Sequence, residues 1–189
     1  MKSHFLSSLG EASETLSALT ALEAPLTEAA ALVSKCLIAG GKLLTCGNGG
    51  SAADSAHFAT EFTCRFSGDR RPYPAIALAS DAGLITAVAN DYAFQDVFAR
   101  QVWAYGKPGD VLLAFSTSGK SRNVLSALEE ARRRKLGTIA FLGKGGGFTA
   151  GAADVELVVP SKVTARIQEA HKFLLHVLCE IVEGVLPKE

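Results

Sequence analysis

The sequence predicts an α/β fold of three layers, in which helices cover both faces of a mainly parallel, five-stranded sheet. Five short segments are nearly all apolar, as is typical of strands that are buried on both faces. Segments with helical spacing of apolar residues alternate with them, which favours parallel strands joined by helical crossovers. With 189 residues, of which 48 % are hydrophobic, the chain can form one well-packed core, so we expect a single domain over residues 1–189.

Residues 1–39 are rich in Ala, Leu, Glu and Ser, and their apolar residues recur at helical spacing. We expect two N-terminal helices here, with a break near Pro25, because proline interrupts a helix interior. Long apolar faces on these helices and on the last helix would either cover the sheet or form an oligomer interface, and the pattern leaves both open.

Residues 40–160 form the predicted α/β core. The expected strands are 42–46, 74–78, 110–116, 138–143 and 155–160. The expected helices between them are 51–64, 81–90, 94–104 and 121–135, of which the helix at 81–90 can be capped by Asp81. The remaining segment, 161–189, contains a last amphipathic helix over 165–185.

Charge and hydropathy exclude some classes of function. Nineteen Lys and Arg balance nineteen Asp and Glu, so nothing favours binding to a phosphate backbone, and we expect no nucleic-acid partner. No run of 18 consecutive apolar residues occurs, and acidic residues interrupt any candidate secretion signal near the N-terminus. The sequence therefore predicts a cytoplasmic protein without a membrane partner.

Two loops have the composition of a ligand-binding edge, since ligands of open parallel sheets lie at the carboxyl ends of the strands. The first is GNGGS, residues 47–51, whose glycines allow close backbone approach and whose following helix offers amide donors. It matches neither the dinucleotide-binding nor the Walker pattern. The second is STSGKS, residues 116–121. Such loops are often ordinary capped turns, but four hydroxyls beside a helix N-terminus favour a phosphate cup.

His57 and Glu61 are four residues apart on a predicted helix and therefore share one face. Such a pair can ligate a divalent ion, although a solvated surface is the more common reason for it. The last helix adds Gln168 and His176, which are about 12 Å apart along a straight helix. Either Gln168 precedes the regular helix or another subunit supplies one of the two. We favour a site across a subunit boundary.

Four motifs together resemble the phosphoheptose isomerase family of sugar isomerase (SIS) domain proteins. They follow in order CGNGGSAADSAHFATEF, AVANDYAFQDVFARQV, GDVLLAFSTSGKSRNVLSAL and ARIQEAHKFLLH. The resemblance implies a flavodoxin-like SIS fold, a homotetramer with active sites between subunits, and isomerisation of sedoheptulose 7-phosphate to D-glycero-D-manno-heptose 7-phosphate. In that family the reaction begins heptose biosynthesis for bacterial surface polysaccharide.

The resemblance also implies roles for individual residues. Glu61 and His176 would be the catalytic acid–base pair, and one Zn²⁺ per subunit would be held by His57, Glu61, Gln168 and His176. Arg65 would assist near the phosphate. The implied substrate contacts are Asn48, Gly49, Gly50, Glu61, Arg65, Asn90, Asp91, Ser116, Thr117, Ser118, Ser121 and Gln168.

Two other functions remain open at this point. One is a non-catalytic SIS protein that binds the replication initiator DnaA, because such relatives share the GNG, STSG and ARIQE segments. They usually lack the residues that correspond to Glu61 and His176, both of which are present here. The other is an isomerase of a different phosphosugar, since the sequence does not define the shape of the pocket.

Overall fold

The computed structural model describes residues 3–188, and its centre is a sheet of five parallel strands in the order β2-β1-β3-β4-β5. The strands are β1 (Leu43–Gly47), β2 (Ala75–Ala77), β3 (Val111–Ser116), β4 (Gly137–Leu142) and β5 (Val155–Val158). Each lies within two residues of its predicted bounds. The predicted α/β class is confirmed, and the sheet is parallel throughout.

The strand order reverses between β1 and β3, which pair directly, with Gly47 opposite Phe115. In an open parallel sheet the loops diverge at such a point and leave a crevice between them. The loops that follow β1 and β3 are the two that the sequence singles out. The topology therefore places both at the same position on the carboxyl edge.

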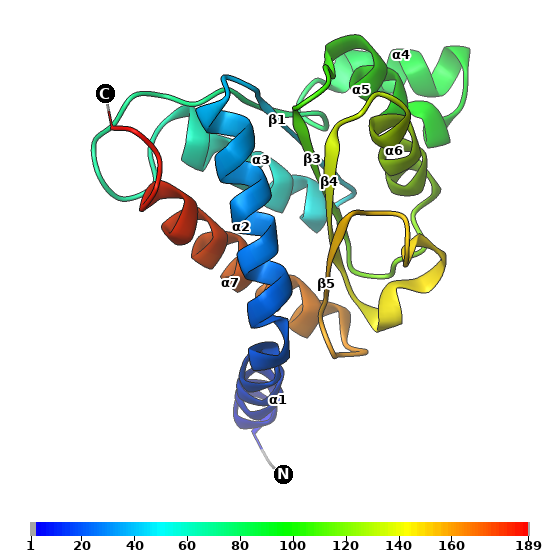
Figure 1. The fold of residues 1–189 in the computed structure, drawn as a ribbon. Coiled ribbons are helices and arrows are strands. Elements are labelled where there is room, and N and C mark those ends of the chain that lie inside the picture. The colour runs from blue at the N-terminus through cyan, green and yellow to red at the C-terminus, as the bar shows by residue number, and fades with distance from the viewer. Residues whose placement is uncertain (1–2, 189) are drawn as a thin grey trace.

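Helices cover both faces of the sheet, as Figure 1 shows. On one face lie α2 (Glu23–Ile38), α3 (Gly50–Thr63) and α7 (Thr164–Glu183). On the other lie α4 (Ala82–Asp91), α5 (Ala99–Tyr105) and α6 (Arg122–Arg133). Successive residues of a strand point to opposite faces of the sheet. Leu43 packs in the core beneath α2, α3 and α7, and its neighbour Leu44 packs in the core beneath α4, α5 and α6.

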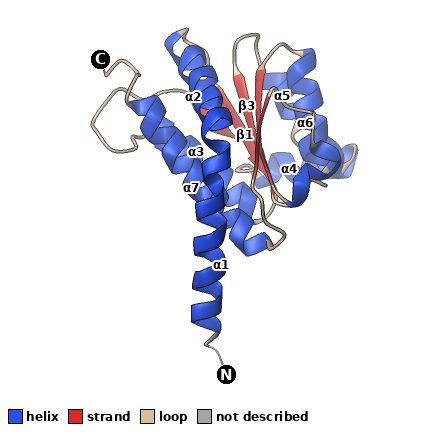
Figure 2. Ribbon diagram, turned by 60° about the horizontal axis from the view of Figure 1, so that its bottom comes forward, coloured by secondary structure: helices blue, strands red, loops and turns tan. Residues whose placement is uncertain are grey.

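Both predicted N-terminal helices are present. Helix α1 (His4–Ala18) is followed by a 3-10 turn, η1 (Leu19–Leu22), and α2 begins at Glu23. The break predicted near Pro25 therefore lies at η1, and Pro25 itself is in the first turn of α2, where its missing N–H removes no helical hydrogen bond. Helix α1 projects from the rest of the molecule (Figure 2).

The run His4–Ile38 is long and apolar enough to cross a membrane by length and composition, with mean hydropathy 1.3 over its most apolar window. Core helices of water-soluble proteins meet the same criterion, and α2 contributes six apolar residues to the core that it shares with α7: Leu26, Ala29, Ala30, Val33, Cys36 and Leu37. The window is 28 % buried, so burial of α2 accounts for part of its hydropathy, and exposed residues of the run account for the rest.

Two further segments differ from expectation. Residues 94–104 do not form one helix but a 3-10 turn, η2 (Phe94–Asp96), followed by α5. A glycine-rich segment that the sequence analysis did not single out forms the 3-10 element η3 (Lys144–Thr149), in which Gly145, Gly146 and Gly147 all have positive φ. This segment packs directly on the loop after β3, as described below.

Candidate active site

The glycine-rich loop after β1 brings three segments into close contact. Gly49 has φ of +56°, a left-handed conformation that favours glycine, and α3 begins at the next residue. A Cβ on Gly50 would lie 2.1 Å from Nε2 of Gln168 on α7. Glycine at position 50 therefore allows the Gln168 amide to reach the start of α3.

The loop after β3 brings two of its four hydroxyl groups together. The Ser116 and Ser121 Oγ atoms are 3.2 Å apart, and the Lys120 amide donates to Ser118 Oγ at 3.1 Å. Ser121 stands at the N-terminus of α6, but its hydroxyl faces Ser116 instead of capping the helix. The loop thus combines hydroxyls with helix N-terminal amides, the groups that bind a phosphate.

The glycine segment of η3 packs against this loop and is hydrogen-bonded to it. Gly119 has φ of +60°, and a Cβ there would lie 2.0 Å from the carbonyl oxygen of Gly146. The Gly119 carbonyl accepts hydrogen bonds from the backbone amide and the hydroxyl of Thr149, at 3.1 and 2.9 Å. A Cβ on Gly147 would in turn lie 2.5 Å from the Gly119 carbonyl oxygen, so neither Gly119 nor Gly147 tolerates a side chain without a shift of the loop.

An amide pair, which the sequence analysis missed, connects the two loops. The side chains of Asn48 and Asn123 donate to each other's carbonyl oxygens, each at 2.8 Å. Asn123 is buried in the first turn of α6. Only the pairing of β1 with β3 brings the two residues together, so no local signal identified Asn123. Asn48, a predicted substrate contact, is held at the crevice by this pair.

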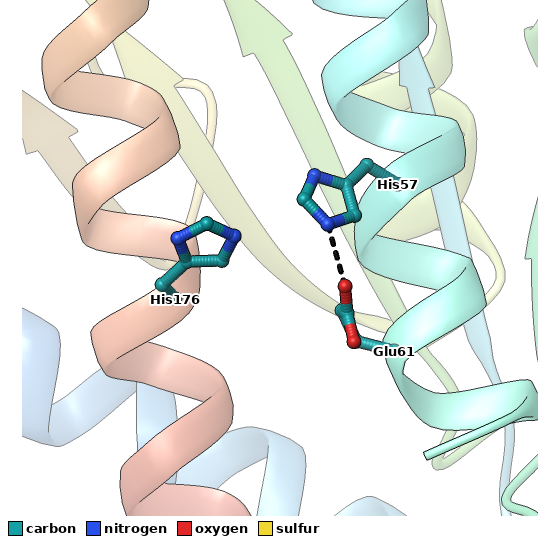
Figure 3. Close-up of side chains that lie close together, drawn as sticks. All are labelled: His57, Glu61 and His176. Atoms are coloured by element: carbon teal, nitrogen blue, oxygen red, sulfur yellow. Dashed lines mark ion pairs between the residues drawn. The ribbon is translucent and has the colours of Figure 1, made fainter. Parts of the chain in front are cut away.

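A cluster of potential metal ligands lies between α3 and α7. His57 and Glu61 extend from α3 and His176 from α7, and one ligand atom of each lies within 4.8 Å of the others (Figure 3). His57 Nε2 is 2.5 Å from Glu61 Oε1, and the two imidazole rings are 5.1 Å apart. Residues far apart in the chain therefore meet as the sequence predicts, while their roles stay predictions.

Two charged residues extend this cluster, and the sequence analysis named neither. The Lys172 ammonium on α7 donates to His57 Nδ1 at 2.7 Å and lies 2.9 Å from Asp54 Oδ1 on α3. Asp54 is buried, with 3 % of its surface exposed. A continuous chain of contacts thus runs from Asp54 through Lys172 and His57 to Glu61.

The surroundings of the histidines on α7 set their protonation. Burial lowers the pKa of His176; His57 and Lys172 lower it further, against Glu61 and Glu180, which raise it. His171 is fully buried, and desolvation lowers its pKa to about 4, although its hydrogen bond with the Leu142 carbonyl opposes the shift. Both imidazoles are therefore mainly neutral near pH 7.

The remaining predicted site residues lie outside this cluster. Gln168 belongs to the regular part of α7, so the alternative that it precedes the helix is wrong. It borders an open pocket of about 430 Å³ together with Asp54 and Lys172. Arg65 follows the end of α3 and donates to the Ser67 carbonyl at 2.9 Å. Asn90 and Asp91 end α4 and are exposed.

A buried ion pair fixes the end of α3 that carries Glu61. The Arg70 guanidinium donates to the carbonyls of Glu61 and Phe62 at 2.6 and 3.1 Å, and to Glu183 Oε1 of α7 at 3.1 Å. Only 3 % of the Arg70 side chain is exposed. This arginine therefore links the last turns of the two helices that carry the cluster.

Comparison with known proteins identifies the family. A model of the SIS domain matches residues 9–143. A phosphoheptose isomerase of Shewanella frigidimarina is 48 % identical over 174 residues, which cover 90 % of this chain and 88 % of that protein.

Two solved structures are similar over almost the whole length, each at 42 % identity. Phosphoheptose isomerase GmhA from Neisseria gonorrhoeae superposes with a TM-score of 0.91, over 96 % of this chain and 97 % of that one. A phosphoheptose isomerase from Francisella tularensis gives 0.88, over 96 % and 95 %. With this fold, these loops and this cluster, the chain belongs to the phosphoheptose isomerase family of SIS-domain proteins.

Proposed function

We propose that this protein converts sedoheptulose 7-phosphate to D-glycero-D-manno-heptose 7-phosphate, the first step of heptose biosynthesis for bacterial surface polysaccharide. The observation that carries the proposal is the meeting of Glu61 and His176 on adjacent helices, in a chain that also has a phosphate-type loop after β3. Identity of 48 % to a phosphoheptose isomerase supports the choice of reaction.

The reaction moves a proton between C1 and C2, which requires a base for the carbon-bound proton and a group that exchanges protons with the sugar oxygens. We assign the first role to the Glu61 carboxylate and the second to His176. The lowered pKa of His176 supports this, because an imidazole that is mainly neutral near pH 7 can accept a proton from a sugar oxygen and return it.

The donor set fits a zinc ion, since two imidazoles and a carboxylate are ligands that zinc prefers. His57, Glu61 and His176 would hold the ion, and we propose Gln168 as the fourth ligand. When bound, zinc would supply a Lewis acid for the carbonyl and enediolate oxygens and would also organise these side chains.

The loop after β3 is the proposed phosphate site, with Ser116, Thr117, Ser118 and Ser121 as its hydroxyl donors. The amides at the start of α6 support this role. We propose that Asn48, Gly49 and Gly50 contact the sugar, that Asn90 and Asp91 line the pocket, and that Arg65 lies near the phosphate.

We propose a homotetramer in which two protomers contribute to each site. Gly50 lies at the phosphate-loop end of α3, and Glu61 follows eleven residues later, about 16 Å along the helix. Arg65 lies beyond Glu61, at the far end of α3. If the phosphate loop of one protomer lay over the His57, Glu61 and His176 cluster of another, the phosphate site and the proposed acid–base pair would meet in one active site.

The direct test is incubation of the purified protein with sedoheptulose 7-phosphate, with and without a chelator, followed by NMR of the sugar. We expect conversion to the aldose, and loss of about 100- to 10,000-fold in rate for Glu61→Gln or His176→Ala with the oligomer intact. Glu129→Gln, an exposed carboxylate on α6, is the matched control. Turnover close to wild type in either variant would refute the acid–base assignment.

The same assay tests the two other functions. Conversion of a pentose or hexose phosphate in preference to the heptose would indicate a different substrate. No turnover of any phosphosugar, together with capture of DnaA in a pull-down, would indicate the non-catalytic binding protein. We expect neither result, because Glu61 and His176 are both present and in contact range.

A further inference from the structure

Lys172 lies between two of the proposed ligands along α7. It lies four residues after Gln168 and four before His176, so all three share one face of α7. Its ammonium lies between the two helices, 2.7 Å from His57 Nδ1 and 2.9 Å from Asp54 Oδ1. A positive charge therefore lies beside His57, one of the proposed ligands of the cation.

Lys172 and Glu61 contact the two ring nitrogens of His57. An ammonium group only donates, so the Nδ1 atom that it contacts acts as the acceptor. The other nitrogen, Nε2, lies 2.5 Å from Glu61 Oε1. The contacts thus define one arrangement in which both nitrogens of His57 are engaged.

A metal ion and Lys172 exclude each other at His57. Coordination through Nε2 requires that nitrogen to be free of its proton, which then resides on Nδ1, where Lys172 can no longer donate. Coordination through Nδ1 displaces the ammonium directly. At either nitrogen, binding of the ion breaks the contact between Lys172 and His57.

Asp54 holds the lysine in place. Its carboxylate has 4 % side-chain exposure, and Oδ1 pairs with the ammonium. Within residues 3–188, Oδ2 is buried without a hydrogen-bond partner, so Lys172 is the principal compensation for this buried charge. The ammonium therefore leaves His57 only if it keeps its contact with Asp54 or if that carboxylate gains another partner.

We propose that Lys172 sets the affinity of the site for divalent cations, as a built-in competitor that must leave His57 before zinc is bound. This inference rests on the proposed metal function. Removal of the competing charge favours the ion in two ways, because it frees the His57 ring and removes repulsion between two cations.

The experiment is calorimetric titration of chelator-treated protein with Zn²⁺, for the wild type, Lys172→Met and Lys172→Arg. We expect Lys172→Met to bind zinc about tenfold more tightly, or more, because one positive charge is lost from a partly exposed site. Lys172→Arg keeps the charge and is expected to bind no more tightly than the wild type. Lys35→Met, at an exposed lysine on α2, controls for the change of residue type.

Lys172→Met leaves Asp54 without its partner and can reduce stability, so Asp54→Asn/Lys172→Met provides a second test with that carboxylate neutralised. Equal or weaker zinc affinity in both variants overturns the proposal. A raised KM for the sugar phosphate with unchanged zinc affinity also overturns it, because Lys172 would then be a substrate ligand. If no form of the protein binds zinc, this inference fails together with the metal assignment, while turnover of sedoheptulose 7-phosphate still reports separately on the isomerase.

Discussion

At the scale of single residues, the α3–α7 boundary combines groups whose protonation depends on burial. His171 lies one position before Lys172, on the core-facing side of α7, with its Nε2 3.1 Å from the Leu142 carbonyl. Its ring stands edge-on to Phe115 and Phe141, at 6.2 and 5.9 Å between centroids. These apolar neighbours leave no water to solvate an imidazolium, so the neutral ring is strongly favoured.

This environment makes His171 a source of acid lability. Its folded pKa of about 4 is below the ordinary value of 6.5, so the folded state binds fewer protons than the unfolded state between these values. Stability is lost as the pH falls through this window. We expect His171→Leu to cost about 1 kcal/mol near pH 7, because the Leu142 carbonyl loses the imidazole donor and keeps only the Val159 N–H, at 2.9 Å.

The pH dependence distinguishes this effect from simple repacking. As the pH falls toward about 4, the difference in unfolding free energy between wild type and His171→Leu should shrink, since only the wild type acquires the cost of charging the ring. Urea unfolding over a pH series measures this, with His4→Leu as the control at an exposed histidine. If the difference in unfolding free energy between the two proteins stays constant as the pH falls toward about 4, the prediction is contradicted.

At the scale of elements, the strands and the two loops were predictable because their signals are local. Continuous apolar runs mark β3 and β4, and glycines or hydroxyls at the strand ends mark the loops. Pro25 indicated the boundary between the two N-terminal helices, because proline is tolerated in the first turn of a helix but not in its interior. The contacts of Lys172 and Asn123 depend on how distant elements pack, so no spacing within the chain reveals them.

The ion pair between Arg70 and Glu183 links α3 to α7, and its contribution to stability can be tested. Burial raises the pKa of Glu183, but backbone N–H groups of Ser67 and Gly68 and the Arg70 guanidinium lower it more, so the net pKa is below the ordinary value. The stability that this carboxylate contributes is present above its ordinary pKa and is lost as the pH falls through the lowered folded value.

We expect Glu183→Gln to destabilise the protein by about 2 kcal/mol near pH 7, because it leaves Arg70 buried without a countercharge. Chemical unfolding at about pH 7 and about pH 4 measures the effect, which should be smaller at the acid end. Glu180→Gln, an exposed carboxylate one turn earlier on α7, serves as the control. Equal destabilisation at both pH values would show that the charge of Glu183 is not what matters.

At the scale of the whole molecule, the exposed apolar residues of α1 support the proposed association of protomers. Phe5, Leu9 and Leu16 fall on one side of the helix by their spacing, with exposed fractions of 70 %, 52 % and 38 %. Helix α1 projects beyond the sheet layers (Figure 2), so this stripe has little of its own chain to cover it. A second copy of the chain is the occupant that the proposed tetramer supplies.

Leu9→Glu places a charge in the centre of this stripe, and we expect it to weaken association by roughly tenfold or more. Size-exclusion chromatography with light scattering measures the mass, and the isomerase assay is run on the same samples. If each site needs two protomers, activity should fall in step with dissociation. Zinc binding by His57, Glu61 and His176 should survive in the separated chains, because a single chain brings these three together.

Ser7→Glu, on the opposite side of α1, should leave both mass and activity unchanged. A wild type that is monomeric, or a Leu9→Glu protein that dissociates and remains fully active, would mean that each chain carries a complete site.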